Sequence, residues 1–97
     1  MWILETLDAS DDGLTFRLPP GAVKTIGRST GAQFIVDAPL VSRLHCQLTA
    51  TADALRVKDL GSTNGTFVNG KRITASVLRD GDRMTVGRVE FTVSKSA

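Results

Sequence analysis

The chain has 97 residues, 41% of them hydrophobic and 23% charged, which is the composition of one soluble globular domain over residues 1–97. A net charge of +2 and an aromatic content of 5% argue against nucleic-acid binding, which calls for a stronger basic patch or for stacking rings. The single cysteine, Cys46, excludes an internal disulfide, and no apolar run is long enough to span a membrane. We therefore expect a cytoplasmic protein.

Short runs along the chain alternate hydrophobic and polar residues with a period of two. In chain order they cover residues 14–18, 46–50, 55–57, 84–86 and 89–93. Turn sequences separate the runs, mostly at intervals of about ten residues or fewer: Asp12-Gly13, Pro19-Pro20-Gly21, Asn64-Gly65, Asn69-Gly70, Asp80-Gly81 and Gly87-Arg88. This pattern is typical of an all-β antiparallel β-sandwich or barrel, and no stretch predicts an amphipathic helix.

Three of these turns allow a closer interpretation. Asn69-Gly70 suits a two-residue hairpin with positive φ at both positions, and Gly87-Arg88 places glycine first, as a type II′ hairpin requires. Asn64-Gly65 also suits a hairpin turn, in which positive φ would project the Asn64 amide outward. The aromatic residues are interpreted as core residues: Trp2, Phe16, Phe34, Phe67 and Phe91.

Three clusters stand out in the polar segments between the predicted strands. Gly27-Arg28 ends a strand over residues 23–26, Ser42-Arg43-Leu44-His45 precedes the strand at 46–50, and residues 59–70 read Asp-Leu-Gly-Ser-Thr-Asn-Gly-Thr-Phe-Val-Asn-Gly. Together they supply two guanidiniums, several hydroxyls, one amide and flexible glycines. A phosphate dianion needs such a set, because its charge calls for a guanidinium fork and its oxygens accept several short bonds.

The order Gly-Arg, Ser-x-x-His and Ser-x-x-Gly-Thr with Asn-Gly resembles the forkhead-associated (FHA) domain. The closing residues 78–93, with Leu-Arg-Asp-Gly-Asp-Arg followed by Val-Gly and Phe-Thr-Val, resemble the last strands of that family. The resemblance extends from Trp2 to Ser94. It implies a β-sandwich of about eleven strands with a phosphothreonine site on loops at one end.

The resemblance also implies a role for each site residue. Arg28 would pair with the phosphate, Ser42 and Thr63 would donate hydroxyls to it, and Arg43 would add a further contact. Asn64 would bond the peptide backbone beside the phosphothreonine. The partner would be a threonine-phosphorylated protein, made by a Ser/Thr kinase and bound by a monomeric domain.

Other residues would support the site without touching the ligand. The resemblance gives His45 the role of tying the loops together, and it gives backbone roles to Gly27, Gly61 and Gly65. Two positions depart from the family. Gln33 stands where an acidic residue is frequent, and Leu40 favours an apolar residue three positions after the phosphothreonine.

Simpler interpretations remain open at several residues. Arg28 alone could be a solvated arginine, and Ser42 and Thr63 could cap turns. The domain could also be a phosphate-independent assembly module that uses its loops or Leu40 and Leu44. The family usually works as a module of larger proteins, so we expect the 97 residues to be one domain of a longer chain.

An enzyme is not expected, and neither is a cofactor or a metal. His45 and Cys46 are neighbours on a predicted strand and should point to opposite faces, so they cannot form a nucleophile–base pair. One histidine and one cysteine are too few for a metal site. The carboxylates Asp59, Asp80 and Asp82 lie at turns and are interpreted as turn caps.

Overall fold

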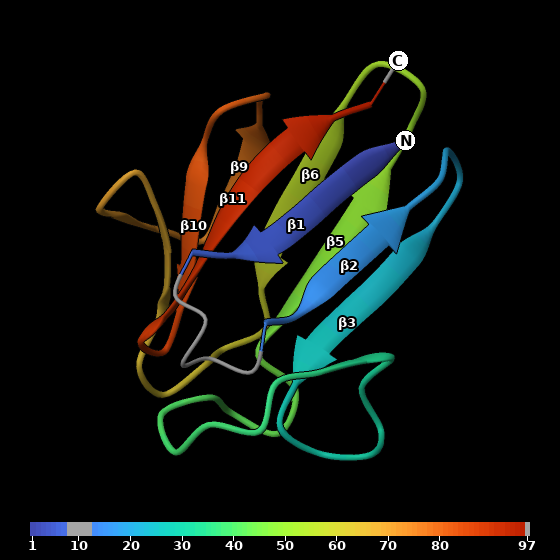
Figure 1. The fold of residues 1–97 in the computed structure, drawn as a ribbon. Coiled ribbons are helices and arrows are strands. Elements are labelled where there is room, and N and C mark those ends of the chain that lie inside the picture. Colours follow the sequence, from blue (N-terminus) through green and yellow to red (C-terminus); the bar gives the residue numbers. More distant parts are fainter. Residues whose placement is uncertain (8–12, 97) are drawn as a thin grey trace.

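Two β-sheets pack face to face in the computed structural model, which describes residues 1–7 and 13–96 (Figure 1). The first sheet has the strand order β2 (Thr15–Leu18), β1 (Trp2–Thr6), β11 (Val89–Lys95), β10 (Arg83–Val86), β7 (Thr66–Val68) and β8 (Lys71–Ile73). The second has the order β4 (Phe34–Ile35), β3 (Val23–Gly27), β5 (Cys46–Ala50), β6 (Leu55–Asp59) and β9 (Ala75–Leu78). These eleven strands, with no helix among the described residues, confirm the predicted all-β sandwich.

The core between the sheets is built by the alternating residues that the sequence pattern indicates. Every second residue of β5, β6, β10 and β11 is buried, as a period of two requires. Trp2, Phe16 and Phe91 are buried as predicted, and Phe34 is half-buried against the core. Phe67 was interpreted as a core residue wrongly, because it lies half-buried on β7 outside the core cluster.

The sheets are joined near one end by a stack of two aromatic rings. The rings of Phe16 on β2 and Phe34 on β4 lie 4.3 Å apart, centroid to centroid, and nearly parallel. Strand β4 lies inside the segment 28–41, where the sequence shows no pattern, and it pairs with β3 in parallel. This is the one parallel pair among the described strands, and the other pairs are antiparallel as predicted.

Two of the three turns interpreted as hairpins are hairpins in the structure, and one is not. Asn69 and Gly70 have φ of 51° and 81° and join β7 to β8, which confirms the hairpin. Gly87, with φ of 63°, joins β10 to β11 as predicted. Asn64-Gly65 is not a hairpin turn: only Gly65 has positive φ, and the segment crosses from β6 in one sheet to β7 in the other. Asp12 of the first predicted turn lies outside the described residues.

The connections that contain the predicted site lie together at one end of the sandwich. Figure 1 shows the loops between β3 and β5 at the end opposite the two chain termini. The described segments include no helix that is long and apolar enough to cross a membrane.

Candidate functional site

The first and second clusters lie side by side because Gly27 has no side chain. A Cβ atom at Gly27 would collide with the carbonyl oxygen of Arg43. The close approach allows the N–H of Arg28 to donate to the carbonyl of Ser42 at 3.0 Å. The N–H of Ser29 donates to the Arg43 carbonyl at 3.3 Å, and its hydroxyl donates to the same oxygen at 3.2 Å.

The side chain of Arg28 is exposed but held in direction. Its Nε donates to the carbonyl of Val41 at 3.1 Å, which leaves the two terminal nitrogens of the guanidinium for a ligand. An open hollow of about 380 Å³ is lined by Arg28, Ser29, Asp37 and Arg43. Two guanidiniums beside one carboxylate favour an anion here, and the Asp37 carboxylate opposes part of that attraction.

Ser42 connects the second cluster to the third. Its hydroxyl oxygen accepts the N–H of Thr63 at 3.1 Å. A serine hydroxyl has one proton of its own, so this oxygen can accept from Thr63 and still donate to a ligand. Ser42 is half-buried and Thr63 is exposed, so both hydroxyls lie within reach of a molecule at the loops.

His45 is fully buried and holds the second and third clusters together. Its Nδ1 accepts the N–H of Ser42 at 3.0 Å, and its Nε2 lies 2.8 Å from the carbonyl oxygen of Gly65. Because Nδ1 is an acceptor, the proton belongs on Nε2, which donates to Gly65. The His45 backbone bonds to Ile26 at 2.8 Å and to Leu60 at 2.9 Å. His45 thus connects the second and third clusters to each other and to the end of strand β3, directly before Gly27 and Arg28.

The third cluster is shaped by the carboxylate of Asp59. It accepts the N–H groups of Gly61 and Ser62 at 3.1 Å each, the Ser62 hydroxyl at 2.6 Å and the Thr66 hydroxyl at 2.8 Å. Burial raises the pKa of this carboxyl, but the hydrogen bonds from Ser62 and Thr66 outweigh burial, so the net pKa is lowered. Gly61 and Gly65 both have positive φ, which lets the chain reverse twice within the cluster.

Asn64 points back into the protein's own loops. Its Nδ2 donates to the carbonyl of Leu40 at 3.0 Å, which corrects the expectation that positive φ projects the amide outward. Leu40 is confined on its other side, since a Cβ at Gly87 would approach its carbonyl to 2.9 Å. A second hollow of about 270 Å³, lined by Ala38, Pro39, Leu40 and Arg88, lies next to this contact.

His45 and Cys46 do not form a reactive pair, although the reason differs from the one expected. Both residues are fully buried, because β5 begins at Cys46 and His45 precedes the regular strand. Burial raises the pKa of the Cys46 thiol to about 12. Both ring nitrogens of His45 bond to backbone groups. The thiol therefore stays protonated near neutral pH and has no base beside it.

Of the other two carboxylates, Asp82 caps a turn as predicted, whereas Asp80 accepts from a different strand, β11. Asp82 accepts the N–H of Arg79 at 2.8 Å across a turn, and Asp80 accepts the N–H of Lys95 at 2.9 Å. Within residues 1–7 and 13–96, no three His, Cys, Asp or Glu side chains come together as metal ligands would.

Sequence reasoning missed two residues that shape the site, Ser29 and Asp37. Ser29 was not singled out, although a serine between Arg28 and a Thr-Gly pair is a turn signal, and its hydroxyl also accepts the N–H of Gly31 at 3.3 Å. Asp37 gave no signal in the sequence. Gln33 accepts the N–H of Thr25 at 2.8 Å, so this departure from the family has a local structural role.

Comparisons with known proteins agree with this geometry. The family model for the FHA domain matches residues 24–87, well over half of the chain. An ABC transporter ATP-binding/permease protein of Mycobacterium tuberculosis is 44% identical over 78 residues, which are 80% of this chain and 9% of that protein. The chain thus spans less than a tenth of that relative's length.

Solved structures are also similar. One is an FHA domain from a structural and functional analysis of phosphothreonine-dependent FHA domain interactions, with 34% identity, a TM-score of 0.89, and coverage of 99% of this chain and 97% of that one. Another is EmbR of Mycobacterium tuberculosis in complex with a low-affinity phosphopeptide, with 34% identity, a TM-score of 0.86, and coverage of 99% and 24%. The chain therefore belongs to the forkhead-associated (FHA) domain family.

Proposed function

We propose that this domain binds a threonine-phosphorylated segment of a partner protein and so reads the product of a Ser/Thr kinase in signalling. One observation carries the proposal. Ser42 accepts the Thr63 N–H while keeping its own proton, beside the oriented guanidinium of Arg28. A set of donors held on three loops that hydrogen bonds connect is suited to an anion with several acceptor oxygens.

Each residue then has a defined task. Arg28 and Arg43 neutralise the phosphate charge, and the hydroxyls of Ser42 and Thr63 donate to its oxygens. The amide oxygen of Asn64 accepts from the peptide backbone while its Nδ2 stays on Leu40. Charge-assisted bonds contribute about 1.5–3 kcal/mol each. After the cost of ordering the peptide, three or four of them give a Kd of about 1 μM.

The relatives support a phosphorylated ligand. One similar structure comes from an analysis of phosphothreonine-dependent FHA domain interactions, and the EmbR structure is a complex with a phosphopeptide. Our proposal extends this ligand class to the present chain.

The proposal makes the domain a binding module that needs no cofactor and catalyses no reaction. The protonated thiol of Cys46 and the fully engaged ring of His45 support it, since neither can start a nucleophilic reaction. We also propose that residues 1–97 form a single domain. We place the domain in the cytoplasm, because the buried free thiol of Cys46 suits a reducing compartment.

A second candidate is a phosphate-independent assembly module. The side chains of Leu44 and Leu60 are 48% and 37% exposed within the second and third clusters. A folded partner could cover these apolar groups without using phosphate.

Fluorescence anisotropy with a degenerate phosphothreonine peptide library separates the two candidates. We expect binding to the phosphothreonine pool, weaker binding to the phosphoserine pool and none to the unphosphorylated pool. The variant Arg28→Ala should lose binding with an unchanged melting temperature, and Arg17→Ala, an exposed arginine on β2, is the matched control. Equal binding by Arg28→Ala would refute the proposal, and no binding in any pool would favour the assembly module.

A further inference from the structure

The edge strand β9 lies outside the site described above and has no partner on one side. It pairs with β6 and with no other described strand. The N–H of Asp59 donates to the carbonyl of Thr74 at 2.8 Å, directly before β9. Because bonded pairs alternate in an antiparallel ladder, Ser76 bonds to Val57, and the backbone groups of Ala75 and Val77 point away from β6.

This edge is unprotected, unlike the other edges in the described part of the sandwich. Exposed sheet edges usually carry lysine, arginine or proline, which oppose pairing with another chain. Arg17 lies on β2, Lys71 and Arg72 lie on β8, and β4 has only two residues. The sequence of β9, Ala-Ser-Val-Leu, has no charge and no proline, and its Val77 side chain is 45% exposed.

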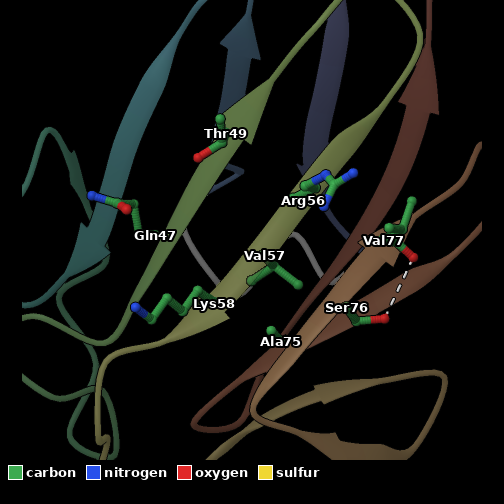
Figure 2. A pocket seen from close by; sticks show the side chains of 8 residues that line it. All are labelled: Gln47, Thr49, Arg56, Val57, Lys58, Ala75, Ser76 and Val77. Carbon is green, nitrogen blue, oxygen red and sulfur yellow. Dashed lines mark hydrogen bonds between the residues drawn. The ribbon is translucent and has the colours of Figure 1, made fainter.

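Cations lie beside this edge on the outer face of the sheet. Arg56 and Lys58 of β6 are the register partners of Val77 and Ala75. Figure 2 shows the Arg56 side chain on the side of β6 that faces Val77 and the Lys58 side chain extended toward β5, together with the 3.4 Å bond from the Ser76 hydroxyl to the Val77 carbonyl. The hollow of about 410 Å³ on this face has no acidic residue in its lining.

The open side of β9 is also cationic. A groove of about 670 Å³ between β8 and β9 is lined in part by Lys71, Arg72 and Arg79. The only carboxylate in its lining is that of Asp82, which already accepts from Arg79 N–H at 2.8 Å and from Asn69 at 3.1 Å. Arg56, Lys71, Arg72 and Arg79 therefore flank an edge at which the backbone groups of Ala75 and Val77 point away from β6, and the Val77 carbonyl meets only the 3.4 Å bond from Ser76.

We propose that β9 is a second docking site, which adds an extended acidic strand of a partner protein to the sheet. The backbone groups of Ala75 and Val77 would pair with the incoming strand, and acidic side chains would lie near the cations on both sides. A second copy of this chain fits less well, because pairing β9 with itself would bring like charges together. This site requires no phosphate and stands independently of the proposed function.

The test is an NMR titration of the isotope-labelled chain with an octapeptide of alternating glutamate and valine. An octapeptide of alternating glutamine and valine is the neutral probe. We expect the acidic probe to shift the Ala75 and Val77 amides and to protect them from exchange, and the neutral probe to bind about tenfold more weakly at low salt. The Arg28→Ala variant should bind the acidic probe unchanged, which separates this site from the phosphate site.

Variants of the edge complete the test. Val77→Pro removes an N–H that points away from β6 and should abolish the shifts. If that variant does not fold, Arg56→Glu combined with Lys58→Glu should weaken binding about tenfold, while Arg17→Glu, the matched reversal on β2, should not. Shifts confined to the loops, equal binding of both probes, or concentration-dependent self-association through β9 without peptide would each overturn the proposal.

Discussion

Removing the imidazole of His45 should destabilise the domain as well as weaken its binding. His45→Ala leaves the half-buried Ser42 N–H and the buried Gly65 carbonyl without partners. Each such group costs about 1–3 kcal/mol, and the lost packing of a fully buried ring adds to this. We expect a loss of about 3–5 kcal/mol, from a total of roughly 5–10 kcal/mol for a domain of this size.

Urea denaturation measures this loss directly, because Trp2, the single tryptophan, is buried and should report unfolding by fluorescence. With a denaturant slope of about 1.5 kcal/mol per molar, the midpoint should fall by about 2–3 M. His45→Asn is the graded control, since its amide oxygen can still accept the Ser42 N–H but cannot reach Gly65. It should lose about 1–3 kcal/mol. An unchanged midpoint in His45→Ala, accompanied by lost phosphopeptide binding, would refute the bridging role and indicate direct contact with the ligand.

Three further predictions follow from neighbouring contacts. Gly27→Ala should destabilise the domain by about 3 kcal/mol or more, because the new Cβ collides with the Arg43 carbonyl. Gly31→Ala is the control, since its Cβ would meet no atom closer than 3.5 Å and should leave the stability unchanged. Thermal denaturation of the two variants measures the difference. Asp37→Asn should tighten phosphopeptide binding by a factor of about 2–5 in a titration at low salt, because the carboxylate lies in the hollow with both arginines; unchanged affinity would place the phosphate elsewhere. The pKa of Asp59 is lowered from 3.8, so its stabilising contribution should be complete above that pH and be lost as the pH falls through the folded-state value. In an acid titration, the free energy of unfolding of Asp59→Asn should depend less steeply on pH than that of the unchanged domain. An equally steep dependence would contradict this prediction.

Most strands and two hairpins could be predicted because each depends on local sequence. Alternation identified β5, β6, β10 and β11, and the Asn69-Gly70 pair has positive φ at both residues. Strands β1 and β9 were not identified from the sequence pattern. The two residues of β4 are also too few to show a period.

The site could be predicted in composition but not in its internal contacts. Asn64-Gly65 has the same turn chemistry whether it closes a hairpin or crosses between sheets, and only the fold decides between them. The bond from Asn64 to Leu40 joins residues far apart in the sequence, so no local pattern reveals it. The bridge formed by His45 followed from the family resemblance, because a histidine before a strand does not by itself indicate its partners.

An NMR titration of the labelled domain with one phosphothreonine peptide from the library is the sharpest test of phosphothreonine recognition by the loops that contain Arg28, Ser42 and Thr63. The unphosphorylated peptide of the same sequence is the control. We expect amide shifts at Arg28, Ser42, Thr63 and Asn64 with the phosphorylated peptide only, and we expect these shifts to be lost in Arg28→Ala. Equal shifts with both peptides, or shifts that do not include these residues, would contradict it.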